Sequence, residues 1–226
     1  PRGDRRFYFV AETGRLLSNK DCGPLQVVRS AYDEHDDTLS LCFAGGDVIS
    51  AQVERGEEVE TRFHSRSRTA RVVHGPWADA VSNIVGEQVR LVEPEHGAAD
   101  RGRGGAATLL ATASLDALAQ TLGVEHVDPR RFRMNFGIEA VGAHEEDGWL
   151  GRRVAIGDAV VVPQGNVGRC VITTQNPDTG RTDLDTLKAL AAYRPKGETT
   201  EPLPFGVHAA VAEPGRVRVG DTVSLL

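Results

Sequence analysis

Hydrophobic and polar residues alternate along several short stretches of this chain, which is the period of a β-strand with one buried face. In residues 38–43, three apolar positions alternate with Ser40 and Cys42. Cys42 is therefore predicted to point away from the core. The stretches predicted as strands are residues 7–10, 15–17, 25–28, 38–43, 54–73, 89–92, 160–162, 170–173 and 217–225.

Three stretches have a helical period instead. The first, residues 76–88, carries an apolar stripe behind a proline, which is well suited to the first turn of a helix. Ser114 is predicted to cap a second helix that ends at Gly123, because serine and glycine are common at those two positions. A third helix is predicted to begin behind Thr182 or Asp183.

Glycine and proline occur along the whole chain, with 25 glycines and 11 prolines, while aromatic residues make up only 5%. Gly14 falls where two early strands need a tight turn, and glycine readily takes the positive φ of such turns. Many short strands joined by glycine turns predict a mainly β fold with a few short helices. Residues 96–105 are polar and rich in glycine, which predicts a flexible linker or loop between two domains.

The charge balance narrows the classes of function. The 226 residues include 26 basic and 32 acidic side chains, and the net charge of -6 opposes non-specific binding to nucleic acid phosphates. No stretch approaches the roughly 20 apolar residues that cross a bilayer, and the first residues lack the apolar centre of a signal peptide. We therefore expect a cytoplasmic protein that binds neither nucleic acid nor membrane.

The cysteines and histidines form no site that is local in sequence. Cys22, Cys42 and Cys170 are far apart, which disfavours a disulfide framework and a structural zinc site. The seven histidines lack the i, i+4 spacing of a helical metal site, and the Gly-x-Ser-x-Gly elbow of many hydrolases is missing. The glycine-rich stretches 102–105 and 165–168 match neither a P-loop nor a dinucleotide-binding turn.

A different chemistry is suggested by Arg133, Asn135, Arg169 and Cys170, which lie in short segments with turn residues. A thiolate is a soft ligand or a nucleophile, and a neighbouring guanidinium such as that of Arg169 favours the ionised form. Arginine binds phosphate with fixed geometry, and asparagine can both donate to and accept from a heterocycle. Singly, each residue also fits an ordinary structural role. Together they predict an anionic heterocycle that meets a sulfur atom.

At these residues the sequence resembles the MOSC domains, which form the C-termini of molybdenum cofactor sulfurases and occur in amidoxime-reducing molybdenum enzymes. The motifs that carry the resemblance, in family order, are RFRMNF (131–136), WLG (149–151), IGD (156–158), RCVITT (169–174), NPDTG (176–180) and PGRVRVGD (214–221). In addition, GDRRF (3–7) with the turn at Gly14 resembles the β-rich module that precedes the MOSC domain in the amidoxime-reducing branch.

The resemblance implies a fold and a domain organisation for nearly the whole chain. Residues 1–95 would form a smaller N-terminal β module, residues 96–105 the linker or loop, and residues 106–226 a β-barrel-like MOSC domain. Amidoxime-reducing members carry a Lys-Ser pair on a strand upstream of Asp4 and Arg5, and this chain begins after that point. The N-terminal module is therefore expected to lack its first strand.

The resemblance also implies the ligand, a molybdenum cofactor of the molybdopterin type. Cys170 would bind molybdenum directly or, in sulfur-carrying members, hold a persulfide. Arg5 and Arg133 would bind the phosphate of the cofactor, and Asn135 its phosphate or pterin. The full set of implied cofactor-binding residues is Arg5, Arg133, Asn135, Gly168, Arg169 and Thr173.

Two further departures from the family pattern affect the implied pocket. Gly168 stands where a serine is often found two residues before the cysteine, and it offers only backbone groups. Amidoxime-reducing members carry a pair of polar residues ahead of the helix that begins near Ser114. The corresponding residues here are 103–106, which contain no hydroxyl group. Arg101 and Arg103 in the same segment could instead form a basic lip beside the anionic ligand, or belong to a solvated linker without a role.

Three functions remain open from the sequence. The first is a molybdenum-dependent oxidoreductase that reduces small N-oxygenated substrates and takes electrons from an external donor protein. The second is a metal-free sulfur-transfer module, in which Cys170 carries a persulfide supplied by a desulfurase that depends on pyridoxal phosphate. The third is a non-catalytic carrier of the molybdenum cofactor. Only family analogy supports the substrate of the first.

Overall fold

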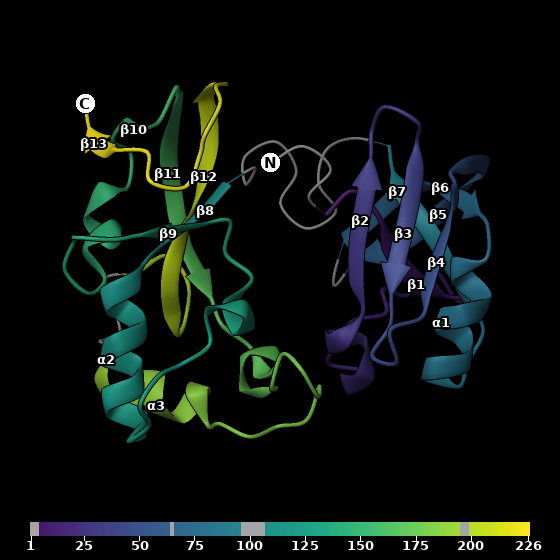
Figure 1. Ribbon diagram of the computed structural model, residues 1–226, viewed down its shortest axis with the longest axis horizontal. Helices are drawn as coiled ribbons and strands as arrows, with labels where there is room; N and C mark the ends of the chain where they lie inside the picture. Colours follow the sequence, from purple (N-terminus) through teal and green to yellow (C-terminus); the bar gives the residue numbers. More distant parts are fainter. Residues whose placement is uncertain (1–4, 64–65, 96–106, 195–198) are drawn as a thin grey trace. The chain divides into compact units, whose positions relative to one another are not determined.

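The computed structural model describes residues 5–63, 66–95, 107–194 and 199–226, and these residues form short strands, turns and a few helices (Figure 1). The mainly β fold expected from the sequence is confirmed. The chain divides into two compact units. We call residues 2–102 together with 175–181 the N-terminal unit, and residues 103–174 together with 182–226 the C-terminal unit.

The N-terminal unit contains two antiparallel sheets. The larger sheet has the strand order β1 (Tyr8–Ala11), β7 (Val89–Pro94), β6 (Arg66–His74) and β5 (Glu54–Phe63). The smaller sheet has the order β2 (Arg29–Asp33), β3 (Thr38–Cys42) and β4 (Val48–Gln52). Among its described residues, this unit also contains the α-helix α1 (Trp77–Val85) and the 3₁₀ helix η1 (Gly23–Val27).

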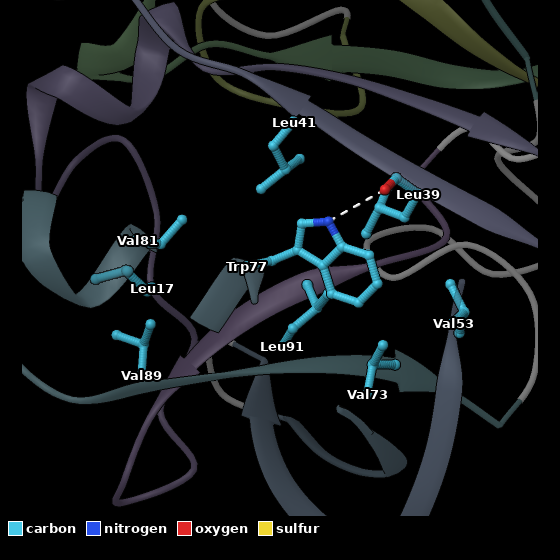
Figure 2. Packing of buried hydrophobic residues seen from close by; sticks show 9 residues of the cluster. All are labelled: Leu17, Leu39, Leu41, Val53, Val73, Trp77, Val81, Val89 and Leu91. Carbon is cyan, nitrogen blue, oxygen red and sulfur yellow. Dashed lines mark hydrogen bonds between the residues drawn. The ribbon is translucent and has the colours of Figure 1, made fainter. Parts of the chain in front are cut away.

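Trp77 lies at the centre of the N-terminal core, where residues of both sheets surround its indole ring (Figure 2). Its side chain is fully buried, and its Nε1–H donates a hydrogen bond to the backbone oxygen of Leu39 at 3.1 Å. Leu39 and Leu41 are buried, whereas Cys42 is only half-buried. The alternation expected for residues 38–43 is therefore confirmed, and it lets β3 close the core over Trp77.

A six-stranded sheet, curled as a half barrel, forms the centre of the C-terminal unit in the part of the chain that the structure describes. The strands in spatial order are β13 (Val223–Leu225), β10 (Val154–Ile156), β11 (Ala159–Gly168), β12 (Pro204–Glu213), β8 (Ala107–Ala111) and β9 (Phe136–Ile138). All neighbouring strands are antiparallel except β8 and β9, which are parallel.

The central strands of this sheet are covered on both faces, so they are apolar on both sides. On β8, Leu109 belongs to one cluster, and its neighbour Leu110 belongs to the other, because successive side chains point to opposite faces. The second cluster includes residues of α2 (Thr112–Leu122) and α3 (Thr186–Tyr193). The first includes Trp149, which ends the 3₁₀ helix η4 (Glu145–Trp149).

Turn glycines behave as the sequence predicts. Gly14 has a φ of 78°, and a Cβ atom there would lie 2.8 Å from the backbone oxygen of Glu60. Gly123 ends α2 with a φ of 68°. At both positions a side chain would be strained, so glycine is required by the backbone.

Two helices begin elsewhere than predicted. Helix α2 starts at Thr112, so Ser114 lies in its first turn, and the Ser114 hydroxyl accepts a hydrogen bond from the backbone N–H of His144 at 2.8 Å. Helix α3 starts at Thr186, because Asp185 caps it by accepting from the backbone N–H of Lys188 at 3.2 Å. The capping contact of Asp185 fixes the start of α3, whereas no side chain caps the start of α2.

Four predicted strands are wrong in whole or in part. Residues 25–28 fall in or directly after η1, because Pro24 favours the first turn of a helix. Residues 15–17 form only isolated bridges, and the last strand is confined to Val223–Leu225. Residues 170–173 form a turn followed by the 3₁₀ helix η5 (Val171–Thr174), for reasons given below.

Residues 175–181 leave the C-terminal unit and form part of the N-terminal one. The side-chain amide of Gln175 donates to the backbone oxygen of Asn19 at 2.9 Å. Gly180 has a φ of 69°, and a Cβ atom at this position would collide with the backbone oxygen of Gly23. A Cβ atom at Gly23 would likewise collide with the backbone oxygen of Gly180, so glycine is needed at both positions.

Some sequence predictions fall on residues outside the described ranges. They are the role of Asp4, the linker or loop at residues 96–105, and the basic lip formed by Arg101 and Arg103. Within the described ranges, none of the helices has the length and apolar character needed to span a membrane.

Candidate functional site

Cys170 lies in the turn between β11 and η5, half-buried and not in a disulfide. Its backbone oxygen accepts two hydrogen bonds from Thr173, one from the N–H at 3.1 Å and one from Oγ1 at 3.0 Å. Thr173 is itself buried and hydrogen-bonded to Thr186 through the two hydroxyls at 2.7 Å. These bonds turn the chain at Cys170 into a 3₁₀ helix, which is why the predicted strand does not form.

The thiol group of Cys170 is not engaged by any hydrogen bond or ion pair from the described residues. The next side chain, Val171, is apolar and 46% exposed. Thr173, one turn further along η5, points into the interior instead and stabilises the backbone. The turn therefore presents a sulfur atom and an adjacent apolar side chain, while its hydroxyl groups face inward.

Arg133 and Asn135 follow the 3₁₀ helix η3 (Pro129–Phe132). Arg133 is exposed and has a left-handed backbone with a φ of 52°, which ends the helix. The backbone N–H of Asn135 donates to Thr108 Oγ1 at 2.8 Å, and Thr108 Oγ1 in turn donates to Asn135 Oδ1 at 2.9 Å. Because the amide oxygen faces Thr108, its NH₂ group is directed away from that residue.

The loop that carries Arg133 is anchored at its start and middle. The Asp128 carboxylate caps η3 by accepting from the backbone N–H of Arg130 at 2.8 Å. Arg131 is only 5% exposed and forms a two-pronged ion pair with Asp183, with distances of 2.7 and 2.8 Å. Since the backbone N–H of Asp183 also binds the oxygen of Thr174, this ion pair ties η3 to the chain that follows η5.

Arg169 directs its guanidinium group at backbone oxygens. Nη1 donates to the oxygen of Phe132 at 2.9 Å, and Nε donates to the oxygen of Phe205 at 3.0 Å. Nη2 donates to the sulfur of Met134 at 2.9 Å and also to the oxygen of Phe205. The guanidinium therefore joins β12 to the loop of Arg133.

Gly168 is closely packed, which explains why no larger residue is found there. A Cβ atom at this position would lie 3.1 Å from both the Cβ of Glu201 and the backbone oxygen of Pro202. Gly168 pairs with Pro204 at the end of β11. A serine hydroxyl at this position would require the 201–202 segment to move.

The C-terminal unit thus brings six of the seven candidate residues into two adjoining segments. Helices η3 and η5 pack against each other, which places the loop of Arg133 and Asn135 beside the segment formed by Gly168, Arg169, Cys170 and Thr173. The seventh, Arg5, belongs to the N-terminal unit, where it is half-buried and has a φ of 54°.

A second polar group in the C-terminal unit was not expected from the sequence. Glu146 is fully buried, and its carboxylate accepts no hydrogen bond from a described side chain. Burial raises the pKa of Glu146 to about 7, although nearby backbone N–H groups of Glu146 and Ala111 oppose the shift. The carboxyl group is therefore largely protonated below neutral pH.

His144 and Tyr193 extend this buried group. The ring nitrogens of His144 and the hydroxyl of Tyr193 are buried without a hydrogen-bond partner among the described residues, and the two rings lie 5.6 Å apart. Burial lowers the pKa of His144 to about 4, with help from the charge of Arg194, and burial raises the pKa of Tyr193 to about 12. The ring of His144 also lies 5.7 Å from that of Phe205, whose oxygen binds Arg169.

Metal coordination by a cluster of protein side chains is not indicated. Within the ranges that the structure describes, no group of three or more His, Cys, Asp or Glu residues could hold an ion. What the C-terminal unit offers is one half-buried thiol beside an exposed guanidinium and an oriented amide. This set suits a ligand that brings its own metal and is anchored through an anionic group.

The family model for the MOSC domain matches residues 93–224. The chain belongs to the MOSC domain family. This family is associated with the molybdenum cofactor. The motifs that suggested the resemblance, from residue 131 to residue 221, all lie inside the matched region.

Curated relatives of this MOSC protein are amidoxime-reducing components. It is 38% identical over 124 residues to the mitochondrial amidoxime-reducing component 1 of Mus musculus, an alignment that covers 52% of this chain and 36% of the relative. It is 37% identical over 98 residues to the mitochondrial amidoxime reducing component 2 of Homo sapiens, covering 41% of this chain and 29% of the relative. The matched part thus spans about a third of the length of these relatives.

Two solved structures are also similar to this MOSC protein. The YuaD protein from Bacillus subtilis aligns with a TM-score of 0.38 and 15% identity, over 54% of this chain and 64% of that one. YiiM from Geobacillus stearothermophilus aligns with a TM-score of 0.41 and 15% identity, over 75% of this chain and 71% of that one.

Proposed function

We propose that this MOSC protein binds a molybdenum cofactor in its C-terminal unit and acts as an oxidoreductase on small N-oxygenated substrates, with Cys170 as the protein ligand of molybdenum. The observation that carries this proposal is the packing of η3 against η5, which places an exposed arginine and an oriented asparagine beside a half-buried thiol. The amidoxime-reducing relatives support the class of reaction.

The residues present fit such a cofactor in their donor chemistry. Cys170 offers a thiol that no described residue binds, and thiolate is a soft ligand suited to this metal. The exposed guanidinium of Arg133 can bind a phosphate by charge-assisted hydrogen bonds. The amide NH₂ group of Asn135, turned away from Thr108, can donate to the phosphate or to the pterin.

A molybdenum cofactor, when bound, supplies two-electron oxygen-atom chemistry that protein side chains lack. The chain's own residues would bind and orient this cofactor. Cys170 ligates through sulfur, Arg133 neutralises the anionic group, and Thr173 holds the backbone of the cysteine turn by its two bonds to the Cys170 oxygen. Val171, exposed and apolar, follows the cysteine directly and would be available to a small substrate beside the thiol.

The proposed reaction also requires an electron source. Reduction of an N–OH group breaks the N–O bond, forms an N–H bond, consumes two electrons and two protons, and releases one water. No flavin or haem motif stands out in the sequence, so we propose that an external donor protein supplies the electrons. Arg5, which the family resemblance implies as a second phosphate ligand, belongs to the N-terminal unit and stays a prediction from the sequence.

The decisive experiment measures molybdenum by elemental analysis and pterin by fluorescence after oxidation, in the full chain made in a host that synthesises the cofactor. We expect the parent to contain molybdenum and pterin, and Cys42→Ser to contain as much of each as the parent. In Cys170→Ser we expect molybdenum retention and amidoxime reduction to be lost. Cyanide-labile sulfur on Cys170, in protein free of molybdenum and pterin, would overturn the proposal in favour of sulfur transfer.

Arg133→Ala gives an independent measure of cofactor binding. A lost charge-assisted hydrogen bond costs roughly 1.5–3 kcal/mol, which corresponds to about a tenfold or larger drop in molybdenum and pterin content. The matched control is Arg130→Ala, which removes a neighbouring arginine that is paired with Asp128. Equal cofactor content in Arg133→Ala and in the parent would show that Arg133 does not contact the cofactor.

A further inference from the structure

The guanidinium of Arg169 contacts several groups of the protein. Besides its bonds to the oxygens of Phe132 and Phe205 and to the sulfur of Met134, its guanidinium carbon lies 5.3 Å from the centre of the Phe132 ring. A guanidinium is planar and always charged, and its donors have a fixed fork geometry. It can therefore hold several acceptors at set distances from one another.

The acceptors come from two different parts of the C-terminal unit. Phe132 and Met134 flank Arg133 in sequence, so two of the bonds hold the loop of Arg133 and Asn135 from both sides. Phe205 belongs to β12, which pairs with β11, the strand that leads to Cys170. One side chain thus links the segment of the thiol to the segment of the proposed anion-binding residues.

The backbone of β12 is shaped for this contact. Between the pairs Asn166–Val207 and Gly168–Pro204 the register shifts, so that β12 has an additional residue there. Such a β-bulge redirects the backbone locally. The bulge contains Phe205, whose oxygen Arg169 binds, and Gly206, which has a φ of 81°.

Gly206 also makes room for the sulfur acceptor. A Cβ atom at Gly206 would lie 2.5 Å from the terminal methyl of Met134 and 2.7 Å from the backbone oxygen of Leu109. Any larger residue would displace Met134, whose sulfur accepts from Arg169. The contact therefore depends on the sequence at three separate positions, Met134, Arg169 and Gly206.

We propose that Arg169 is a positioning residue: its guanidinium sets the placement of Arg133 and Asn135 relative to Cys170, and it neither activates the thiol nor binds the anion. This inference rests on the proposed function, since it concerns how the same site is held ready for its ligand. A thiol-activating role would need the positive charge alone, which lysine also provides. A positioning role needs the fork, which lysine lacks.

Arg169→Lys is the main variant, and Arg194→Lys is its matched control. Arg194, like Arg169, is half-buried, and its Nε donates at 3.1 Å to the oxygen of Pro204, the residue next to Phe205, but its other partner is Asp147 rather than the loop of Arg133. Loss of a half-buried arginine is thus common to both variants. Only the first loses the link to η3.

Hydrogen exchange, followed by mass spectrometry on cofactor-free protein, measures directly how often the loop of Arg133 and Asn135 opens. The N–H groups of Arg133 and Asn135 are hydrogen-bonded in the parent, to Arg130 and Thr108. We expect residues 133–136 to exchange about tenfold faster or more in Arg169→Lys, with α2 unchanged, and to stay at the parental rate in Arg194→Lys, because local opening controls exchange. Unchanged exchange in Arg169→Lys, or an equal acceleration in both variants, would overturn the proposal.

Two further readouts separate positioning from activation of the thiol. The pH profile of Cys170 alkylation by iodoacetamide is expected to be the same in the parent, in Arg169→Lys and in Arg169→Gln, all on a Cys22→Ser, Cys42→Ser background. A profile displaced to higher pH in Arg169→Gln alone would show that the charge serves the thiol, and would overturn the proposal. Molybdenum and pterin content is expected to fall about tenfold in Arg169→Lys and to remain parental in Arg194→Lys.

The failure of the proposed function can be told apart from the failure of this inference. If the parent itself contains neither molybdenum nor pterin, the proposed function fails, while the exchange and alkylation results still decide whether Arg169 positions the loop. If Arg169→Lys does not accumulate as folded protein, Met134→Leu removes only the sulfur acceptor. It is expected to accelerate exchange at residues 133–136 by a smaller factor, and parental exchange in it would count against the proposal.

Discussion

Trp77 and Glu146 are both fully buried, one in each unit, but their polar atoms are in opposite situations. The indole N–H of Trp77 donates to the oxygen of Leu39, and apolar residues surround the rest of the ring. The carboxylate of Glu146 accepts from no side chain among the described residues, and burial raises its pKa to about 7. The first arrangement stabilises the fold, whereas the second costs free energy whenever the carboxyl group ionises.

The contrast extends to the neighbours of each residue. Around Trp77, the buried side chains of the two sheets are all aliphatic, and aromatic side chains such as Phe9 and Tyr32 pack at the edge of the cluster. Around Glu146, the buried groups include His144 and Tyr193, both without partners among the described residues, and His144 packs on Phe205 next to the contact of Arg169. Proteins often accept such local costs close to functional sites. The C-terminal unit thus contains buried groups whose ionisation costs stability, whereas the buried polar atom of Trp77 in the N-terminal core is paired.

The largest expected effect is that of Trp77→Ala. Removing this ring leaves a cavity between two sheets and should lower the free energy of unfolding of the N-terminal unit by about 3–5 kcal/mol. Hydrogen exchange at β3 and β7 measures this loss in the N-terminal unit separately from the C-terminal strands. A loss under about 1 kcal/mol would mean that the core is not organised around Trp77.

Glu146→Gln should remove a pH dependence. The pKa of Glu146 is about 7 in the folded protein and 4.5 when exposed, so its stabilising contribution is complete below pH 4.5 and is lost as pH rises through 7. The loss approaches about 3 kcal/mol above pH 8, because each pKa unit corresponds to about 1.4 kcal/mol. Glutamine stays neutral, so urea unfolding at pH 5, 7 and 8 should show a flatter profile in the variant.

Glu145→Gln is the control for that experiment, since Glu145 is the adjacent residue and is exposed. Its variant should keep the parental loss of stability between pH 4.5 and 8. An equal flattening in both variants would show that the pH dependence does not come from the buried carboxyl group.

His144→Phe should act on the acidic side with the opposite sign. The pKa of His144 is lowered from 6.5 to about 4, so its contribution to stability is present above pH 6.5 and is lost as pH falls through 4. Phenylalanine keeps the ring contact with Tyr193 but cannot take up a proton. Acid unfolding should therefore shift to lower pH in His144→Phe and stay unchanged in His126→Gln, which alters an exposed histidine.

The smallest effect is expected on the outer face of the N-terminal unit. Arg71 and Glu58 pair across β6 and β5 at 2.7 Å, with about half of each side chain exposed. Exposed pairs of this kind contribute about 0–1 kcal/mol and weaken with salt. Glu58→Gln should change urea unfolding by no more than that, and a larger loss would show that the N-terminal unit depends on its surface charges as well as on Trp77.

Local rules predicted those parts of the fold that depend on backbone chemistry. The alternation at residues 38–43 and the glycine turns at Gly14 and Gly123 were correct because strand period and positive φ are properties of the segment itself. The predicted cap at Ser114 and the predicted strand at residues 170–173 were wrong because the hydroxyls of Ser114 and Thr173 make contacts that the strand and helix periods do not reveal. Ser114 accepts from His144, and Thr173 binds both Cys170 and Thr186.

The candidate site shows the same division. Cys170, Arg133 and Asn135 could be proposed from their motifs, but the acceptors of Arg169 are backbone oxygens and carry no signature in the sequence. Thr108, which orients Asn135, lies on a strand well before it in the chain. Their roles depend on tertiary packing and could only be read from the structure.

Glu146 was missed for a different reason. It stands in the run Glu145, Glu146 and Asp147, which by composition looks like an exposed acidic turn. One signal was available: Trp149 follows three residues later, and residues three apart share a face of a 3₁₀ helix. Both are buried in η4.

The membership of residues 175–181 in the N-terminal unit has a consequence for synthesis on the ribosome. At about 5–20 residues per second, roughly 4–15 s pass between the emergence of Gly102 and that of Gln175. During that interval the growing chain holds Gly23 without the close packing that Gly180 provides. The unit that is made first is therefore completed late, and a nascent chain arrested near residue 102 would leave this part of its surface open to chaperones.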